Sequence, residues 1–329
     1  MKKIIVLLCV LYLPSSAGDW IRESIDLTIN TRFSEAENLL KERMEKGDSS
    51  LAVNFYYASV LNSKMTHFEN QLDEETFFKA LNKVIDQGEN ILEQHNLSQN
   101  DKAQTEFYVG SAYGYLGFYQ GQNGQWFRAL SNGEKAYNYL SQAVETDSTI
   151  WDAYLGLGAY KYWLSTKIYW IPLIPDQRDE GIRLIKKTIN HNSYSKYMAM
   201  HQLIYILLDY GQFDEAKELA EKVVSVYPES TFMRWAQSHV YMKMKDLPKA
   251  IECYKVLLDQ IDNDSQANPH HRITCLARLA DMYTRSDSCM QAQNIKHTIL
   301  NDAYFKNHNN DDEVDRLLRE ISERCSDNK

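Results

Sequence analysis

Two helical hairpins built on the same plan follow each other between Tyr197 and Asp264, at an offset of about 34 residues. In each, an apolar helix leads through a short turn into an amphipathic helix, which a small residue opens: Ala216 in the first hairpin and Ala250 in the second. Self-similarity at such a period is typical of α-helical repeat arrays. Because one hairpin cannot bury both of its apolar faces, the units must stack and share a continuous core.

The residues of these two hairpins resemble the tetratricopeptide-repeat (TPR) family. Gly211 provides the turn of the first hairpin, Pro228 ends it, and Tyr254 follows Ala250 by one helical turn. The family's pattern needs a small residue where the two helices cross, such as Ala216, with large residues around it. This resemblance implies an all-α fold, a right-handed α-solenoid, and binding of other macromolecules rather than catalysis.

The same landmarks continue outward along the chain when insertions are allowed in the loops, which helical repeats tolerate. By hairpin, they are Trp20, Phe33 and Ala36; Ala58, Leu61 and Gly88; Gly110, Tyr113, Ala136, Leu140 and Ala143; Tyr154, Leu157, Gly158 and Gly181; and, after the two clear repeats of residues 197–264, Leu276, Ala280, Tyr283 and Ala292. A helix with a polar face at residues 311–325 is typical of a cap. We therefore predict about seven hairpins plus a C-terminal capping helix over residues 18–329.

The fourth hairpin is interrupted by an apolar loop at residues 167–177, since Gly181 follows Ala136 at a spacing longer than one repeat. Residues 100–190 also weakly resemble a TPR subgroup that contains a eukaryotic inclusion-clearance protein. A solvent-facing loop is seldom this apolar. Two interpretations remain open: the loop folds back onto the solenoid, or it presents apolar side chains to a partner or a membrane interface. The side chains concerned are Tyr169, Trp170, Ile171 and Leu173.

The first seventeen residues have the features of a secretory signal peptide: Lys2 and Lys3, an apolar run, and small residues ending at Ala17. We expect cleavage after Ala17 and export to the periplasm, the cell surface or the medium. Four cysteines then remain, which permits two disulfides but does not select among three pairings. They are Cys253, Cys275, Cys289 and Cys325.

Charge and motifs argue against several classes of function. The formal net charge of −9 is spread over helices of mixed sign, without the Lys/Arg stripe of a nucleic-acid footprint. No metal-ligand spacing, phosphate-binding loop or nucleophile motif occurs, so we expect no cofactor, no metal and no small-molecule substrate. The remaining enzyme hypothesis is an α/α-toroid acting on glycans, with Asp152, Asp179 and Glu180 as its available carboxylates.

Aromatic residues are concentrated between Phe107 and Trp170, and some fall on the first helices of the hairpins. In TPR stacks these first helices line the concave groove. Tyr and Trp combine large contact area with a polar edge, which suits the binding of a peptide or helix. The predicted groove residues are Phe107, Tyr115, Tyr162, Trp163, His201, Tyr205, Trp235 and His239.

The sequence thus favours an exported, non-catalytic scaffold that binds a protein or peptide in an aromatic groove. One alternative is an envelope protein that contacts the membrane or an outer-membrane complex through residues 167–176. The glycan-active enzyme is the other.

Overall fold

The structure is a computed structural model that describes residues 19–168, 175–264, 266–308 and 312–325. The described residues form sixteen α-helices. These are α1 Trp20–Ile29, α2 Phe33–Glu45, α3 Leu51–Phe68, α4 Glu74–Leu92, α5 Gln99–Gln122, α6 Trp126–Thr146, α7 Ala153–Ile168, α8 Arg178–Asn190, α9 Lys196–Tyr210, α10 Phe213–Val226, α11 Thr231–Met244, α12 Leu247–Asn263, α13 Pro269–Arg285, α14 Cys289–Asn301, α15 Ala303–Asn307 and α16 Asp312–Arg324.

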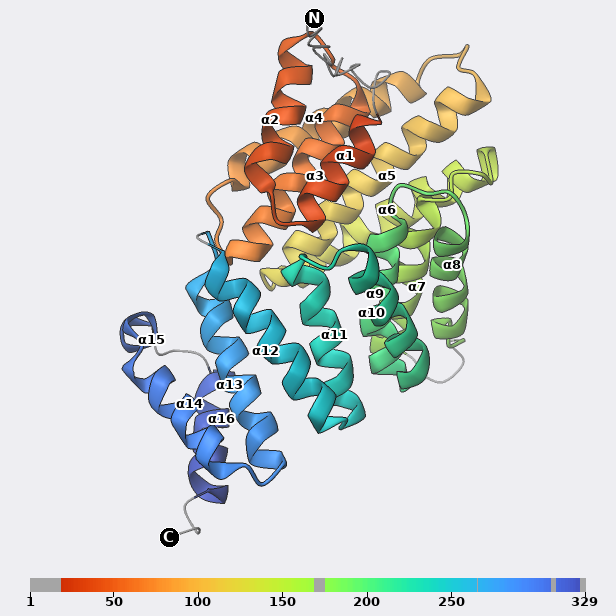
Figure 1. Cartoon of the computed structure of the whole chain (residues 1–329). Coiled ribbons are helices and arrows are strands. Elements are labelled where there is room, and N and C mark those ends of the chain that lie inside the picture. Colours follow the sequence, from red (N-terminus) through yellow and green to blue (C-terminus); the bar gives the residue numbers. More distant parts are fainter. Residues whose placement is uncertain (1–18, 169–174, 265, 309–311, 326–329) are drawn as a thin grey trace, which may run out of the picture.

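The first fourteen helices pack as seven consecutive hairpins, and α16 packs on the last of them (Figure 1). This confirms the predicted all-α solenoid of about seven hairpins with a capping helix. The five-residue helix α15 was not predicted from the sequence.

Local signals place the helix ends where the sequence has polar or flexible residues. The hydroxyls of Ser50, Ser98 and Ser230 accept hydrogen bonds from backbone amides in the first turns of α3, α5 and α11. Such N-caps satisfy amides that have no partner within the helix. At the other end of α9, Gly211 ends the helix in the left-handed conformation at φ 83°, which glycine adopts without steric cost.

Small residues allow the two helices of a hairpin to approach closely. Ala216 and Ala250 are fully buried in α10 and α12. The closest approach joins α7 to α8, where a β-carbon added to Gly158 would lie 2.5 Å from the carbonyl oxygen of Gly181. The interior is packed so tightly at this crossing that only glycine fits at either position.

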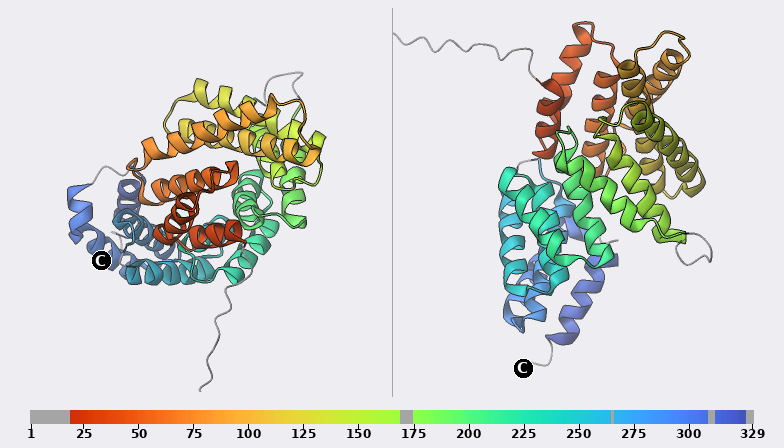
Figure 2. Two further views of the ribbon diagram at one scale, coloured as in Figure 1. Left: turned by 90° about the horizontal axis from the view of Figure 1, so that it is seen from above. Right: turned by 90° about the vertical axis from the view of Figure 1, so that its right-hand side faces the viewer.

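The solenoid completes a turn and touches itself, which the sequence pattern did not predict. The hydroxyl of Tyr227 donates to Asp26 at 2.6 Å, and that of Ser230 donates to the carbonyl of Ile29 at 2.5 Å. Ile29 is buried among apolar side chains of α9–α11. Seen from above, α1–α3 are enclosed by the later helices, and the side view places the N-terminal half over the C-terminal half (Figure 2). The end of α1 therefore rests on the start of α11.

The next hairpin repeats this contact one step further along the chain. The side-chain amide of Asn268 donates to the carbonyl of His67 at 3.3 Å, so the end of α3 rests on the start of α13. Glu69 lies 3.6 Å from both His270 and His271. In each of these three hydrogen bonds between the two turns, the bonded residues are 201 residues apart in the sequence. Hairpins 1 and 2 thus dock on hairpins 6 and 7 in the same way.

In both steps, one polar side chain serves two helices. Ser230 accepts a hydrogen bond from the amide of Met233 at 3.3 Å, and Asn268 accepts one from the amide of His270 at 2.9 Å. Each side chain thus caps its own helix while it donates to the upper turn of the solenoid, to which hairpins 1 and 2 belong. We expect the double variant Ser230→Ala, Asn268→Ala to lose roughly 2–4 kcal/mol of stability, because two N-caps and two hydrogen bonds between the turns disappear. Hydrogen exchange should show faster exchange of the amides in α1.

The matched control for this variant is Ser98→Ala, which removes an N-cap from α5 where the serine bonds to Asp101 of the same helix. This variant should lose about 1 kcal/mol of stability, and the hydrogen exchange of the α1 amides should stay as in the wild type. If the double variant leaves the protection of α1 as in the wild type, the two polar bridges do not hold the turns together.

One disulfide, Cys289–Cys325, joins the start of α14 to the residue that follows α16. Cys253 and Cys275 are buried free thiols, and burial raises their pKa values to about 11 and about 12. Among the described residues, the four cysteines thus form one disulfide and leave two inert thiols. Within the same residues, no helix is long and apolar enough to cross a bilayer.

Candidate functional site

A row of aromatic and cationic side chains lines the first helices of hairpins 5, 6 and 7. We call it the concave wall and define it by Tyr205, Trp235, His239, His271 and Arg278. The rings of Tyr205 and His239 are 5.7 Å apart, and those of Trp235 and His271 are 6.2 Å apart. All five side chains are half-buried, so each keeps a solvent-facing part. The wall is a continuous surface across α9, α11 and α13.

The repeat period explains part of this row. Trp235 lies one repeat after His201, and His239 lies one repeat after Tyr205, so equivalent positions of α9 and α11 face the same way. Within each helix, the two positions are one helical turn apart and lie on one side. The ring of His201 stacks on Phe232 with centroids 3.7 Å apart. The structure thus brings together four of the predicted groove residues.

Arg278 of α13 supplies the positive charge of the wall. Its guanidinium donates to Nδ1 of His239 at 3.2 Å, lies 6.0 Å from the centre of the Trp235 ring, and pairs with Glu313 of α16 at 3.1 Å. Its Nε is buried without a hydrogen-bond partner. Arg278 is therefore held in place by α11 and α16.

Three buried histidines, His67, His201 and His239, are neutral at physiological pH. Burial lowers the pKa of His201 to about 3, and burial followed by the charge of Arg278 lowers the pKa of His239 to about 4. Burial also lowers the pKa of His67 to about 4, with a further contribution from His271. Burial raises the pKa of Tyr205 to about 12. Tyr205 and His239 therefore present a neutral hydroxyl and a neutral ring beside the guanidinium of Arg278.

Phe107 and Tyr115 belong to a separate group on the upper turn. Both rings contact Phe55, at 6.3 and 5.6 Å, and Tyr115 shares a hydrogen bond of 2.7 Å with Ser59. Phe55 and Phe107 are buried in the packing between α3 and α5. This group offers little surface to a partner.

Tyr162 is a core residue rather than a groove residue, which corrects the prediction for this position. Its side chain is fully buried, and its hydroxyl donates to Asp209 at 2.5 Å and lies 3.2 Å from the carbonyl of Ile206. The neighbouring Trp163 contacts the Tyr162 ring edge-on, with ring centroids 5.2 Å apart, and is 41% exposed. The loop side chains Tyr169, Trp170, Ile171 and Leu173 lie outside the described residues.

The carboxylates of the enzyme hypothesis are engaged in local structure. Asp152 accepts from the backbone and hydroxyl of Ser195 before α9. Asp179 accepts from Tyr210, and Glu180 pairs with Arg183. Among the described residues, no group of three His, Cys, Asp or Glu side chains is placed to hold a metal ion.

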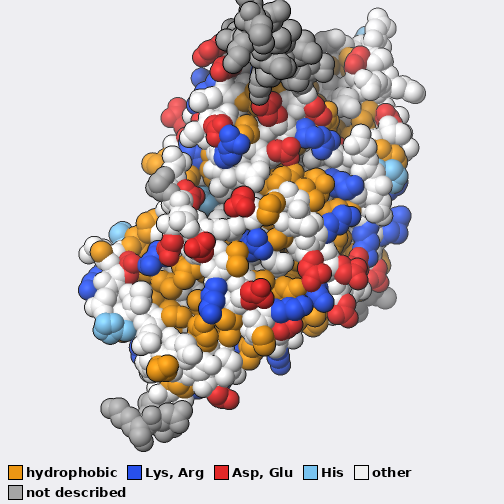
Figure 3. Space-filling view, viewed as in Figure 1, with side chains coloured by type: hydrophobic (Ala, Val, Ile, Leu, Met, Phe, Trp, Pro, Cys, Tyr) orange, Lys and Arg blue, Asp and Glu red, His pale blue; other side chains and the backbone are white. Residues whose placement is uncertain are grey.

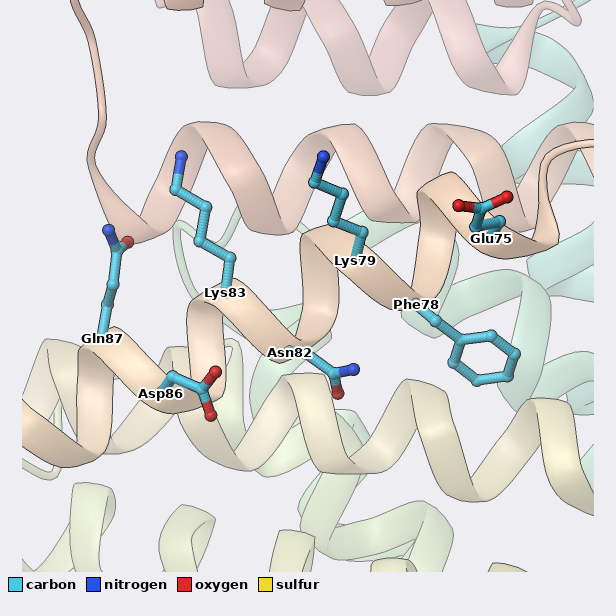
Figure 4. A pocket seen from close by; sticks show the side chains of 7 residues that line it. All are labelled: Glu75, Phe78, Lys79, Asn82, Lys83, Asp86 and Gln87. Carbon is cyan, nitrogen blue, oxygen red and sulfur yellow. The ribbon is translucent and has the colours of Figure 1, made fainter.

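Two hollows on the described surface are shallow. One of about 890 Å³ is lined entirely by α4, from Glu75 to Gln87, and is open to solvent (Figure 4). A second, of about 530 Å³, lies at the α9–α10 turn. On the face shown in Figure 3, acidic and basic side chains are interspersed with apolar ones. These features favour contact with an extended surface rather than enclosure of a small molecule.

No protein-family model matches the chain, and no curated protein matches its sequence. Solved structures do match. The APC/C hetero-tetramer Cut9–Hcn1 aligns at a TM-score of 0.56 and 14% identity, over 94% of this chain and 53% of that one. The chain thus spans about half the length of that protein. At this identity, the likeness shows a shared fold.

Further alignments have lower TM-scores. A thermophilic TPR protein of Thermus thermophilus gives 0.45 at 15% identity, over 69% of this chain and 100% of that one. YrrB, a TPR protein with an unusual peptide-binding site, gives 0.43 at 12% identity, over 73% and 93%.

Proposed function

We propose that this TPR-type α-solenoid is a non-catalytic scaffold. It binds a protein or peptide partner on its concave wall. The observation that carries the proposal is the row of half-buried Tyr205, Trp235 and His239 beside Arg278. Large aromatic side chains and arginine are the residues that contribute most to protein–protein binding.

The wall fits an amphipathic segment better than a uniformly charged one. Its rings offer apolar contact at little cost in side-chain entropy, while the Tyr205 hydroxyl and Arg278 offer polar contacts. We include Trp163 of α7, the first helix of the fourth hairpin, in the proposed surface because it is 41% exposed. A segment carrying an acidic or amide group among apolar residues would satisfy both features.

The proposal is tested by placing a photo-crosslinking phenylalanine analogue at position 235 and, as the control, at position 213. Phe213 lies on the outer helix α10 and is 39% exposed. We expect a partner protein to crosslink from position 235 and not from 213. A Tyr205→Ala, Trp235→Ala variant should bind that partner at least tenfold more weakly, since each hot-spot aromatic contributes about 2 kcal/mol or more.

An equal yield of the same crosslinked proteins from both positions would remove the wall as the binding site. Binding by the double variant at wild-type strength would do the same. Because the replaced side chains are half-buried, circular dichroism and thermal unfolding of the variant must first show an intact fold.

We further propose that the protein is exported, with residues 1–17 removed. The Cys289–Cys325 bond supports this, since disulfides form and persist in oxidising compartments. We test the removal of residues 1–17 and the presence of the disulfide by measuring the intact mass of the protein. The protein is isolated from its own cells without a reducing agent. A chain that still carries residues 1–17, or that is fully reduced, would contradict export.

A further inference from the structure

The ring of His67 connects the upper turn of the solenoid to the concave wall. His67 lies in the last turn of α3, and its ring meets that of His271 on α13 edge to face, with centroids 5.0 Å apart. The ring of His271 lies in turn 6.2 Å from that of Trp235. Edge-to-face contacts at about 4.5–7 Å are favourable and orient one ring against the other. A row of three rings therefore runs from the end of α3 into the wall.

The upper turn holds His67 in place behind this contact. Its ring packs on Phe33 of α2, with centroids 5.4 Å apart, and on Phe68, at 4.9 Å. Its backbone carbonyl accepts the hydrogen bond from Asn268, the N-cap residue of α13. His67 is thus fixed to both turns, and its ring can support that of His271.

Glu69 makes a second contact with the same wall residue. Its carboxylate lies 3.6 Å from Nε2 of His271 and 3.6 Å from Nε2 of His270. His270 also contacts Tyr304 of α15, at 6.5 Å between ring centroids, whereas His271 contacts Trp235 of the wall. Glu69 therefore acts on the wall through His271.

We propose that His67 and Glu69 are positioning residues of the concave wall. They hold the ring of His271 against Trp235, so the wall has its binding shape only while the end of α3 rests on α13. This inference rests on the proposed function, because it concerns how the same wall is regulated. When the contact between the turns opens, His271 is released and Trp235 loses an edge contact.

The coupling must act in both directions. A partner that binds Trp235 and His271 in their observed arrangement favours the closed contact between the turns, because linkage between two equilibria is reciprocal. Binding on the lower turn should therefore slow the hydrogen exchange of amides in the last turn of α3, which belongs to the upper turn.

The backbone at Glu69 allows its side chain to be removed without harm to α3. Glu69 ends that helix in the left-handed conformation at φ 50°, which glycine adopts without steric cost. Lys245 ends α11 in the same conformation at φ 61° and is exposed. Glu69→Gly and Lys245→Gly are therefore matched variants, and both should melt at or above the wild-type temperature.

The first measurement follows Trp235 in the full chain without a partner. The six tryptophans are labelled with fluorotryptophan, and Trp235→Phe assigns the signal of Trp235 in the fluorine NMR spectrum. We expect Glu69→Gly and His67→Ala to shift this signal, because the ring that faces Trp235 loses its support. Lys245→Gly should leave it in place.

Two further comparisons separate positioning from a general loss of structure. His67→Phe should keep the wild-type signal of Trp235, because phenylalanine preserves an edge contact to His271. The signal of Trp151, whose ring stacks on His191, should stay unchanged in all of these variants. A Trp235 signal that keeps its wild-type position in Glu69→Gly or in His67→Ala overturns the inference.

The second measurement uses as its probe the purified protein that crosslinks from position 235. Its Kd should rise at least about fivefold for Glu69→Gly, which is the lower end of the usual range for coupled sites. The Kd for Lys245→Gly should equal that of the wild type. An equal Kd for Glu69→Gly and the wild type would refute the inference even if the Trp235 signal moves.

Failure of the inference and failure of the proposed function give different results. If Tyr205→Ala, Trp235→Ala loses binding while Glu69→Gly binds as the wild type does, the wall is the binding site and the positioning role is wrong. If no protein crosslinks from position 235, the proposed function is wrong, and the fluorine signal of Trp235 alone decides whether the upper turn positions the wall.

Discussion

Gly158→Ala is expected to lower the free energy of unfolding by about 3 kcal/mol or more. The added methyl group would lie 2.5 Å from the carbonyl oxygen of Gly181 and 2.7 Å from Ile185. The nearest obstacle is backbone, so no side-chain rotation relieves the overlap, and α7 must move away from α8. Urea unfolding followed by circular dichroism measures the loss.

The matched control is Gly114→Ala in α5. There the added methyl group meets only the β-carbon of Ala136, at an ordinary 3.8 Å. Alanine is favoured over glycine within a helix by up to about 1 kcal/mol, so this variant should be as stable as the wild type or more stable. Equal stability of the Gly158 variant and the wild type would show that the α7–α8 crossing is looser than described.

Acidification from pH 7 to pH 5 should destabilise the protein by several kcal/mol. His67, His201 and His239 have folded-state pKa values of about 4, 3 and 4, against 6.5 in an unfolded chain. Below pH 6.5 the unfolded chain binds protons that the folded one does not, so stability falls as the pH falls toward 4. Each histidine contributes on the order of 1–2 kcal/mol over this range.

His201→Phe isolates one of these groups. Phenylalanine keeps the stacking on Phe232 and removes both the titration and the buried Nε2 that has no partner. Between pH 7 and pH 5, urea unfolding should show a loss smaller by about 1–2 kcal/mol than in the wild type. Replacement of the exposed His95 controls for removing a histidine as such. An unchanged pH dependence in His201→Phe would contradict the neutral state of the buried ring.

The hairpins could be predicted from the sequence because each one repeats a local rule. Residues such as Ala36, Ala216 and Ala250 are small because two helices cross there, and large side chains surround them at helical spacing. The contact between turns follows no such rule. Ser230 and Ile29 are 201 residues apart, and neither residue type signals a partner at that distance.

The candidate site was predicted as far as the period holds. His201, Tyr205, Trp235 and His239 follow from the repeat offset, but the spacing from the start of α11 to the start of α13 is longer than that offset. His271 and Arg278 therefore do not stand one repeat after Trp235 and His239, and the period does not indicate them. The prediction for Tyr162 is wrong for a different reason. Its ring lies in the core, where its hydroxyl donates a hydrogen bond to Asp209.

Contact between turns also sets the order in which the chain can complete its structure. The α1 helix leaves the ribosome first, but the serine that bonds to its last carbonyl is synthesised 201 residues later. At about 5–20 residues per second, this delay is roughly 10–40 s. During that time Ile25 and Ile29 lack the lower-turn surface that covers them in the finished protein. The α1 helix of the nascent chain is thus prone to aggregation until α9–α11 have been synthesised. A chaperone would be needed most at this helix.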